Sequence, residues 1–159
     1  MTTIGITGHS SLDPSAVSLI EDGLREALAP FGRENLTGIT CLAKGADQIF
    51  AQLVLDMGGR LEVIIPAADY DRIPNPVERA RFQALLEAAV AVHRMPFAAA
   101  SPPAYFAASQ ELVRRSEVLL AVWDGEPPDG RGGTADAVEY ARRSGRQSIV
   151  VWPTGAVRG

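Results

Sequence analysis

Two kinds of apolar pattern alternate along the chain. Short runs that are apolar throughout, such as residues 118–123, are typical of strands buried on both faces of a parallel sheet. Longer segments carry apolar residues three or four positions apart, which is the pattern of a helix with one buried side. The clearest of these stripes consists of Val17, Ile20, Leu24 and Leu28.

In chain order, these patterns predict five strands that alternate with helices. The strands are expected at residues 3–7, 36–42, 61–65, 118–123 and 147–152. Helix starts are expected at residues 13–14, 47, 75–76, 101 and 134, where capping residues, proline or glycine introduce a helical stretch. A short edge strand also fits within residues 90–100.

This alternation determines the fold class that we expect. Because parallel strands joined by helices require right-handed crossovers, the sequence predicts an α/β fold. It should be a Rossmann-like, doubly wound and mainly parallel sheet of about five strands, flanked by helices. With 159 residues, the chain is long enough for one domain with a substantial core. We expect this domain to span residues 1–153 and the C-terminal tail, residues 154–159, to be frayed.

Glycine-containing loops follow three of the predicted strands. Glycine lets backbone N–H groups approach a ligand closely, and a helix N-terminus offers unpaired donors to an anion. None of the three loops has the Walker A or the G-x-G-x-x-G pattern. The first loop contains Gly8, the second contains Lys44-Gly45, and the third runs from Asp124-Gly125 to a helix that begins after Gly132-Gly133.

The three loops together are stronger evidence for a ligand site than any one of them alone. Taken alone, glycine after a strand more often marks a tight turn. The carboxyl ends of parallel strands, however, lie at the same edge of a sheet, where ligands bind in doubly wound folds. The three loops should therefore meet at that edge, and together they predict a nucleotide site.

The composition excludes several classes of partner. The formal net charge is −4 and aromatic residues make up 6% of the chain, so binding to nucleic acid is not expected. No apolar run approaches the roughly 20 residues that a membrane span requires. No signal peptide is evident at the N-terminus. We therefore expect a cytoplasmic protein with no membrane partner.

Few side chains are suited to metal or nucleophilic chemistry. The chain has two histidines, His9 and His93, and one cysteine, Cys41, so no metal site is expected. Cys41 lies in an apolar strand, where an inert buried thiol is expected. Lys44 is the single lysine, and it is either a phosphate contact or a consequence of an arginine-rich composition. His9 is either a donor to phosphate or ribose, or a turn residue.

The loops resemble motifs of a known superfamily. The segment Thr40-Cys41-Leu42-Ala43-Lys44-Gly45-Ala46-Asp47 is similar to the S-G-x-A-x-G-I-D segment of the DNA-processing-A family. Residues Ala121-Val122-Trp123-Asp124-Gly125, with Gly132-Gly133-Thr134, resemble the Lonely Guy family and its relatives. The chain thus resembles the SLOG superfamily of Rossmann-like domains, and its opening Thr7-Gly8-His9 is similar to bacterial members of that superfamily. This resemblance implies a nucleotide or nucleotide derivative as ligand, with no further cofactor required.

The loop residues suggest a role for each part of the site. Gly132, Gly133 and Thr134 would hold a phosphate through backbone N–H and hydroxyl donors. Gly8 and Gly45 would let the neighbouring loops approach the ligand closely. Further contacts are expected from His9, Ser10, Lys44, Asp47, Asp124 and Gly125, with Asp47 or Asp124 accepting hydrogen bonds from ribose hydroxyls.

The first interpretation is simple binding of the ligand, and a sensor would be one example. Two alternatives to it stay open. Lonely Guy enzymes carry P-G-G-x-G-T-x-x-E, whose glutamate serves nucleotide hydrolysis, whereas the third residue after Thr134 is Ala137 here. One alternative is a nucleoside 5′-monophosphate phosphoribohydrolase that releases free base, with Asp136 or Glu139 as the carboxylate near the ribose. The other alternative is a DNA-processing or recombination factor, which the net charge disfavours.

The resemblance to the Lonely Guy family also implies a homo-oligomer, most simply a dimer, formed through helices that flank the site. The alanine-rich, partly apolar residues 80–91 and 105–113 would supply such a surface. Burial of the same residues against the sheet is an equally good interpretation.

Overall fold

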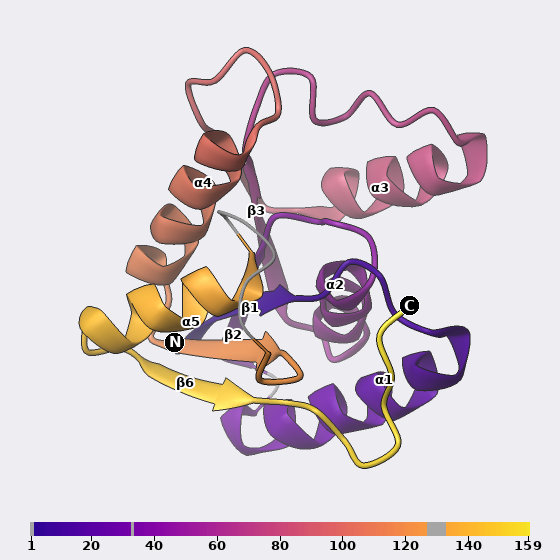
Figure 1. Ribbon diagram of the computed structural model, residues 1–159, viewed down its shortest axis with the longest axis vertical. Coiled ribbons are helices and arrows are strands. Elements are labelled where there is room, and N and C mark those ends of the chain that lie inside the picture. Colours follow the sequence, from indigo (N-terminus) through magenta and orange to yellow (C-terminus); the bar gives the residue numbers. More distant parts are fainter. Residues whose placement is uncertain (1, 33, 127–132) are drawn as a thin grey trace.

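A computed structural model describes residues 2–32, 34–126 and 133–159. Over these residues the chain forms a six-stranded sheet flanked by five α-helices (Figure 1). The strands are β1 (Thr2–Gly8), β2 (Leu36–Thr40), β3 (Arg60–Ile65), β4 (Ala91–Arg94), β5 (Val118–Val122) and β6 (Gln147–Val150). The helices are α1 (Pro14–Leu28), α2 (Ala46–Asp56), α3 (Pro76–Ala88), α4 (Pro102–Arg115) and α5 (Thr134–Arg143), with a 3₁₀ turn (Ala29–Phe31) after α1.

The strand order is β4-β3-β2-β1-β5-β6, and all neighbouring strands are parallel. This arrangement confirms the predicted α/β, Rossmann-like, doubly wound sheet. The sixth strand is β4, which lies within the stretch where a short edge strand fitted the sequence. Its four residues alternate between half-buried and exposed, so β4 lacks the continuous apolar run that marks the central strands.

The direction in which the sheet grows reverses beside β1. The chain adds β2, β3 and β4 on one side of β1 and then returns to place β5 and β6 on the other side. The carboxyl ends of β1 and β5 therefore flank the crevice where ligands bind in open α/β sheets. The loops that follow these two strands carry His9 and Asp124.

Helices cover both faces of the sheet. α1, α2 and α3 pack on one face, where Leu24 of α1 and Phe50 of α2 are fully buried. α4 and α5 pack on the opposite face, against Ile39, Ile64 and Leu119. Figure 1 shows α4 and α5 together on the left and α2 and α3 on the right. Within the described residues, none of these helices has the length and apolar character that crossing a membrane would need.

The helices begin in two different ways. In α1, α3 and α4 the capping residues Asp13, Asn75 and Ser101 accept hydrogen bonds from backbone N–H groups of the first turn. By contrast, α2 and α5 begin at Gly45 and Gly133, and neither start has a side-chain cap. The backbone donors at these two helix starts are therefore not covered by a capping side chain.

The C-terminal tail is ordered, which corrects the expectation that it frays. Leu12 and Arg158 form an antiparallel bridge, and the Gly159 N–H donates to the Ser11 C=O (3.1 Å). The tail therefore lies along the β1–α1 loop (Figure 1). Its partners are distant in sequence, so a local pattern does not reveal them.

Candidate functional site

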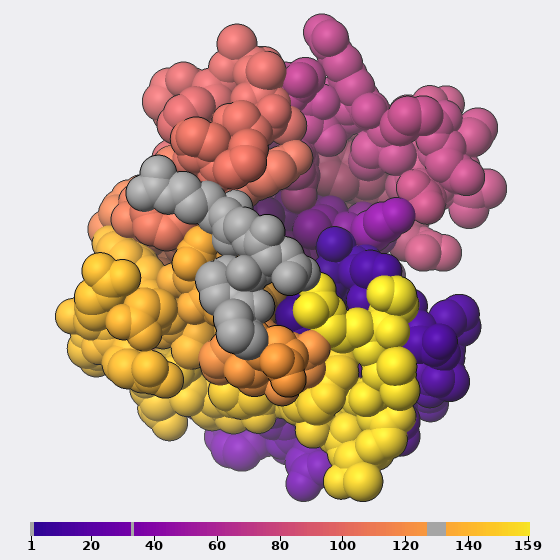
Figure 2. Space-filling model, viewed as in Figure 1, coloured from indigo at the N-terminus to yellow at the C-terminus, as the bar shows by residue number. Residues whose placement is uncertain are grey.

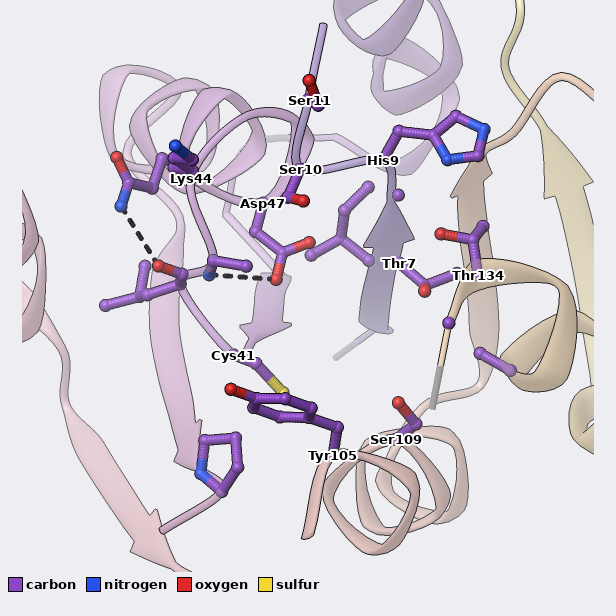
Figure 3. A pocket seen from close by; sticks show the side chains of 18 of the residues that line it. Thr7, His9, Ser10, Ser11, Cys41, Lys44, Asp47, Tyr105, Ser109 and Thr134 are labelled. Atoms are coloured by element: carbon purple, nitrogen blue, oxygen red, sulfur yellow. Dashed lines mark hydrogen bonds between the residues drawn. The ribbon is translucent and has the colours of Figure 1, made fainter. Parts of the chain in front are cut away.

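A cavity of about 590 Å³ opens at the carboxyl edge of the sheet. The β1–α1 loop, the β2–α2 loop and the start of α5 contribute residues to it, as do α4 and the loop after β3 (Figure 3). Its polar lining includes Thr7, His9, Ser10, Ser11, Lys44, Asp47, Gln48, Ser109, Thr134 and Arg158. Its apolar lining includes Leu42, Pro66, Ile73, Phe82, Tyr105 and Leu112.

The first two glycine loops touch each other beside this cavity. The Ala46 N–H donates to the His9 C=O (3.3 Å). Gly45 has a φ of +86°, and a Cβ at this position would lie 2.7 Å from the carbonyl oxygens of His9 and Ser10. Gly8 is similarly confined, because a Cβ there would lie 2.5 Å from the Cβ of Ala46. The contact between the two loops therefore requires glycine at both positions.

The β2–α2 loop is held in place by Asp47. The Asp47 carboxylate accepts hydrogen bonds from the Ala43 N–H (3.3 Å), the Cys41 N–H and the Thr40 hydroxyl. The Thr40 oxygen in turn accepts from the Leu42 N–H (2.9 Å). Leu42 has a left-handed φ of +56°, which is unfavourable for leucine and needs such support. Asp47 thus fixes the backbone that faces the ligand space.

The Asp47 carboxyl itself lines the cavity and is 6% exposed. Burial raises the pKa of Asp47 to about 7, although the hydrogen bonds from Ala43, Thr40 and Cys41 favour the carboxylate. Burial also raises the pKa of the neighbouring Cys41 thiol, which keeps this thiol neutral. Asp47 can therefore carry a proton near neutral pH and either donate to or accept from a ligand.

His9 and Asp124 connect the carboxyl ends of β1 and β5. The Asp124 N–H donates to His9 Nε2 (3.3 Å), which also lies 3.3 Å from Asp124 Oδ1, and Arg158 Nη1 lies 3.6 Å from Asp124 Oδ2. Burial opposes ionisation of Asp124, but the hydrogen bond from the Glu126 N–H, the interaction with His9 and the charge of Arg158 outweigh it and lower its pKa. The Trp152 ring packs edge-on against His9, with centroids 5.6 Å apart. These contacts fix the side chains of His9 and Asp124 between β1 and β5, where the direction of strand addition reverses.

The start of α5 supplies the third part of the site. Gly133 and Thr134 both line the cavity, and Thr134 is buried. Figure 3 shows Thr134 and His9 on one side of the cavity and Lys44 and Asp47 on the other. Gly132, the remaining glycine of this motif, lies outside the described residues.

Three predicted contact residues stand next to the cavity without lining it. They are Gly45, which shapes the contact between loops, Asp124, which holds His9, and Gly125. Gly125 has a φ of +85° and forms the turn after β5. The predicted residues that do line the cavity, within the described part of the chain, are Gly8, His9, Ser10, Lys44, Asp47, Gly133 and Thr134.

The two predicted catalytic carboxylates are not among the described residues that line the cavity. Glu139 is exposed and forms ion pairs with Arg142 (3.4 Å) and Arg143 (3.3 Å). Ala137, which stands where the Lonely Guy motif has its glutamate, does line the cavity. This chain therefore presents a methyl group at that position. Asp136, which is half-buried, and Glu139 stay predictions that the geometry does not favour.

Sequence reasoning missed the opposite wall of the cavity. Tyr105, Ser109 and Leu112 line it from one face of α4. Tyr70, from the loop after β3, packs edge to face against Tyr105 (centroids 6.3 Å apart) and against Phe82 (5.9 Å). Tyr105, labelled in Figure 3, lines the cavity together with Tyr70 and Phe82, so an aromatic surface closes this end of it. The helical spacing of these α4 residues is the available signal, but it fits an oligomer surface equally well.

Comparisons with protein-family models and with curated proteins found no match. Solved structures do match, over 94% of this chain. DNA processing protein A from Helicobacter pylori, reported with a single-stranded DNA binding mode, is 16% identical over 64% of its own chain, with a TM-score of 0.67. The molybdenum cofactor binding protein from Rippkaea orientalis is 16% identical over 75% of its chain (TM-score 0.62). The protein TM1055 is 21% identical over 73% of its chain (TM-score 0.61).

The chain therefore shares its fold with these proteins, and this is the fold that the resemblance to the SLOG superfamily implies. DNA processing protein A represents one of the two families whose motifs the sequence resembles, and its structure aligns with nearly the whole chain. The observed fold therefore agrees with the resemblance that the motifs carry. At these sequence identities the similarity concerns the fold, and the ligand of this domain has to be argued from its own cavity.

Proposed function

We propose that this domain binds a nucleotide or a nucleotide-derived small molecule in the cavity at the carboxyl edge of its sheet. One observation carries the proposal: the loops after β1 and β2 and the start of α5 converge on one cavity, and the helices α2 and α5, which begin there, have no side-chain caps. Such helix N-termini attract anions. A volume of about 590 Å³ is also typical of small-molecule sites.

The two ends of the cavity differ, and the difference suggests how a nucleotide would lie. At the polar end, the hydroxyls of Ser10 and Thr134 and the ammonium group of Lys44 would bind the phosphate. At the aromatic end, Tyr105 would pack against the base. Asp47 would hydrogen-bond a ribose hydroxyl, because its carboxyl can serve as donor or acceptor.

Binding is favoured over hydrolysis by the positions of the carboxylates. Hydrolysis of the glycosidic bond needs a catalytic carboxylate beside the ribose, and Asp47, the carboxyl placed there, is instead bound by the Ala43 N–H, the Cys41 N–H and the Thr40 hydroxyl of its own loop. Ala137 occupies the motif position inside the cavity, and Glu139 is paired with arginines outside it. We therefore propose binding as the activity, in the manner of a sensor. Single-stranded DNA as the ligand is disfavoured by the net charge of −4, and the homodimer stays a prediction.

We expect at least one of AMP, GMP, CMP, UMP, NAD and ADP-ribose to stabilise the protein against heat. A ligand that binds only the folded state adds about 3 kcal/mol to the free energy of unfolding at a hundredfold excess over Kd. For a chain of this size, that gain raises Tm by about 5 to 10 °C. Differential scanning fluorimetry with each compound measures the shift.

Two variants check that the shift comes from this cavity. Lys44→Ala should reduce it, because the ammonium group at the polar end is lost. Arg25→Ala should leave it unchanged, because Arg25 lies on α1 and is paired with Glu21 and Asp22. Chromatography of the same samples should return the nucleotides intact. The absence of a shift with all six compounds would contradict the proposal.

A further inference from the structure

The C-terminal segment, defined as residues 151–159, is tied to the body of the protein along its length. Val151 and Pro153 pack on Gly23 of α1, where a Cβ would lie 2.9 Å and 3.1 Å from their side chains. Trp152 packs edge-on against His9. The absence of a side chain at Gly23 thus lets the C-terminal segment lie directly on α1. The segment leaves β6 in a fixed direction, toward the carboxyl edge of the sheet.

The far end of the C-terminal segment is paired with the β1–α1 loop. Arg158 forms an antiparallel bridge with Leu12, and a Cβ at Gly159 would lie 2.8 Å from the Ser11 hydroxyl oxygen. Figure 2 shows the segment, in yellow, lying against the indigo N-terminal residues. Because both ends of the segment are anchored, the Arg158 side chain is held at a defined place.

That place is the cavity, which Arg158 lines. Among the described residues that line the cavity, Lys44 is the lysine and Arg158 is the arginine. The guanidinium of Arg158 pairs with Asp124 at 3.6 Å, and 37% of the Arg158 side chain is exposed. An ion pair this exposed contributes little stability by itself, so a stabilising role does not explain the position of Arg158. The same lining also contains three carboxylates, on Asp47, Glu78 and Glu126.

We propose that Arg158 binds the phosphate of the ligand, so that the C-terminal segment completes the site; this rests on the proposed function. A guanidinium has five N–H donors in a planar fork that matches phosphate oxygens, and it can share its partners when an anion enters. Asp124 positions this fork beside His9, between the carboxyl ends of β1 and β5. Without Arg158, an entering phosphate would meet the Asp124 carboxylate unneutralised.

Isothermal titration calorimetry tests the assignment with phosphorylated and unphosphorylated probes. The probes are inorganic pyrophosphate, AMP, GMP, CMP and UMP, and the four corresponding nucleosides. We expect Arg158→Gln to weaken binding of the phosphorylated probes by about ten- to a hundredfold. Nucleoside binding should be unchanged, which also shows that the variant keeps an intact cavity. The affinity of Arg158→Lys for the phosphorylated probes should lie between those of the wild type and Arg158→Gln, because lysine keeps the positive charge but lacks the planar fork of donors.

Two further variants separate a direct contact from indirect effects. Arg25→Gln removes the same charge from an exposed, ion-paired arginine on α1 and should bind every probe as the wild type does. In the double variant Asp124→Asn with Arg158→Gln, the carboxylate that Arg158 neutralises is also gone. A direct contact predicts that phosphorylated probes still bind weakly. Recovery of wild-type affinity in the double variant would show that Arg158 only neutralises Asp124, and would overturn the proposal.

The remaining outcomes also decide the question. The assignment of Arg158 is wrong if the phosphorylated probes bind Arg158→Gln as tightly as the wild type, or if none of them binds the wild type. If pyrophosphate binds in an Arg158-dependent way and no nucleotide or nucleoside binds, Arg158 is an anion-binding residue and the proposed nucleotide function fails instead. The two proposals can therefore fail separately.

Discussion

Replacing Gly45 with alanine is expected to abolish nucleotide binding. The new Cβ would lie 2.7 Å from the carbonyl oxygens of His9 and Ser10, which are backbone atoms and cannot rotate away. The β1–α1 and β2–α2 loops would have to separate, and the start of α2 would move with them. The left-handed φ of +86° adds about 1–2 kcal/mol of strain for a residue with a Cβ.

Gly58 provides a matched control at the other end of α2. It also has a left-handed φ, +79°, but a Cβ there would meet nothing within 4 Å. Gly58→Ala should therefore cost about 1–2 kcal/mol of unfolding free energy through strain alone and leave nucleotide affinity unchanged. Urea unfolding and isothermal titration calorimetry measure the two effects. Equal nucleotide affinity in the Gly45 and Gly58 variants would contradict the role given to the contact between the loops.

The second large effect expected is a fall in stability as pH rises, caused by Asp47. Burial raises the pKa of Asp47 from 3.8 to about 7 in the folded chain. Folding therefore takes up a proton at Asp47 between these two pH values. This contribution leaves the protein most stable below about pH 4 and lowers the free energy of unfolding by about 4 kcal/mol as pH rises through about 7.

The Asp47→Asn variant isolates this contribution from the other titrating groups. Asparagine keeps a side-chain carbonyl that can accept from the Ala43 N–H, but it does not titrate. Relative to the wild type, Asp47→Asn should be similarly stable at about pH 4 and more stable by about 4 kcal/mol at about pH 8. Urea unfolding at the two pH values measures the difference. A difference that does not change with pH would mean that Asp47 has an ordinary pKa.

The loop side of the site could be predicted from the sequence because local patterns decide it. The run at 118–123 is too continuously apolar for an exposed strand, and the glycines that follow the strands mark where each of them ends. Because the sheet is parallel, the carboxyl ends of its strands all lie at one edge. That reasoning places Gly8, Lys44 and Thr134 near one another without any knowledge of packing.

The opposite wall of the cavity could not be predicted, because it depends on how α4 lies on the sheet. α4 crosses β1, β2 and β3, and this position turns Tyr105 and Ser109 toward the cavity. The apolar residues at helical spacing indicate that one side of α4 is buried, but they do not indicate which part of the molecule, or which partner, covers that side. The interpretation as an oligomer surface was therefore as consistent with the sequence as a ligand contact.

The order in the C-terminal segment was also beyond local reasoning. Its threonine, proline and glycine residues indicate a frayed end when only neighbours in sequence are considered. The contacts that fix it, Trp152 with His9 and Arg158 with Asp124, join opposite ends of the chain. Gly23 is the one local signal, because glycine inside a helix costs stability unless something packs closely against it.

The most direct test of the nucleotide site is a map of backbone amide chemical shifts. ¹⁵N-labelled protein would be titrated with the compound that gives the largest thermal shift in the panel. We predict that the largest changes fall at Gly8, Gly45 and Thr134 and at their neighbours, with little change at the opposite edge of the sheet. Changes concentrated at the C-terminal ends of α4 and α5, around Arg114 and Arg142, would place the ligand elsewhere and contradict the account.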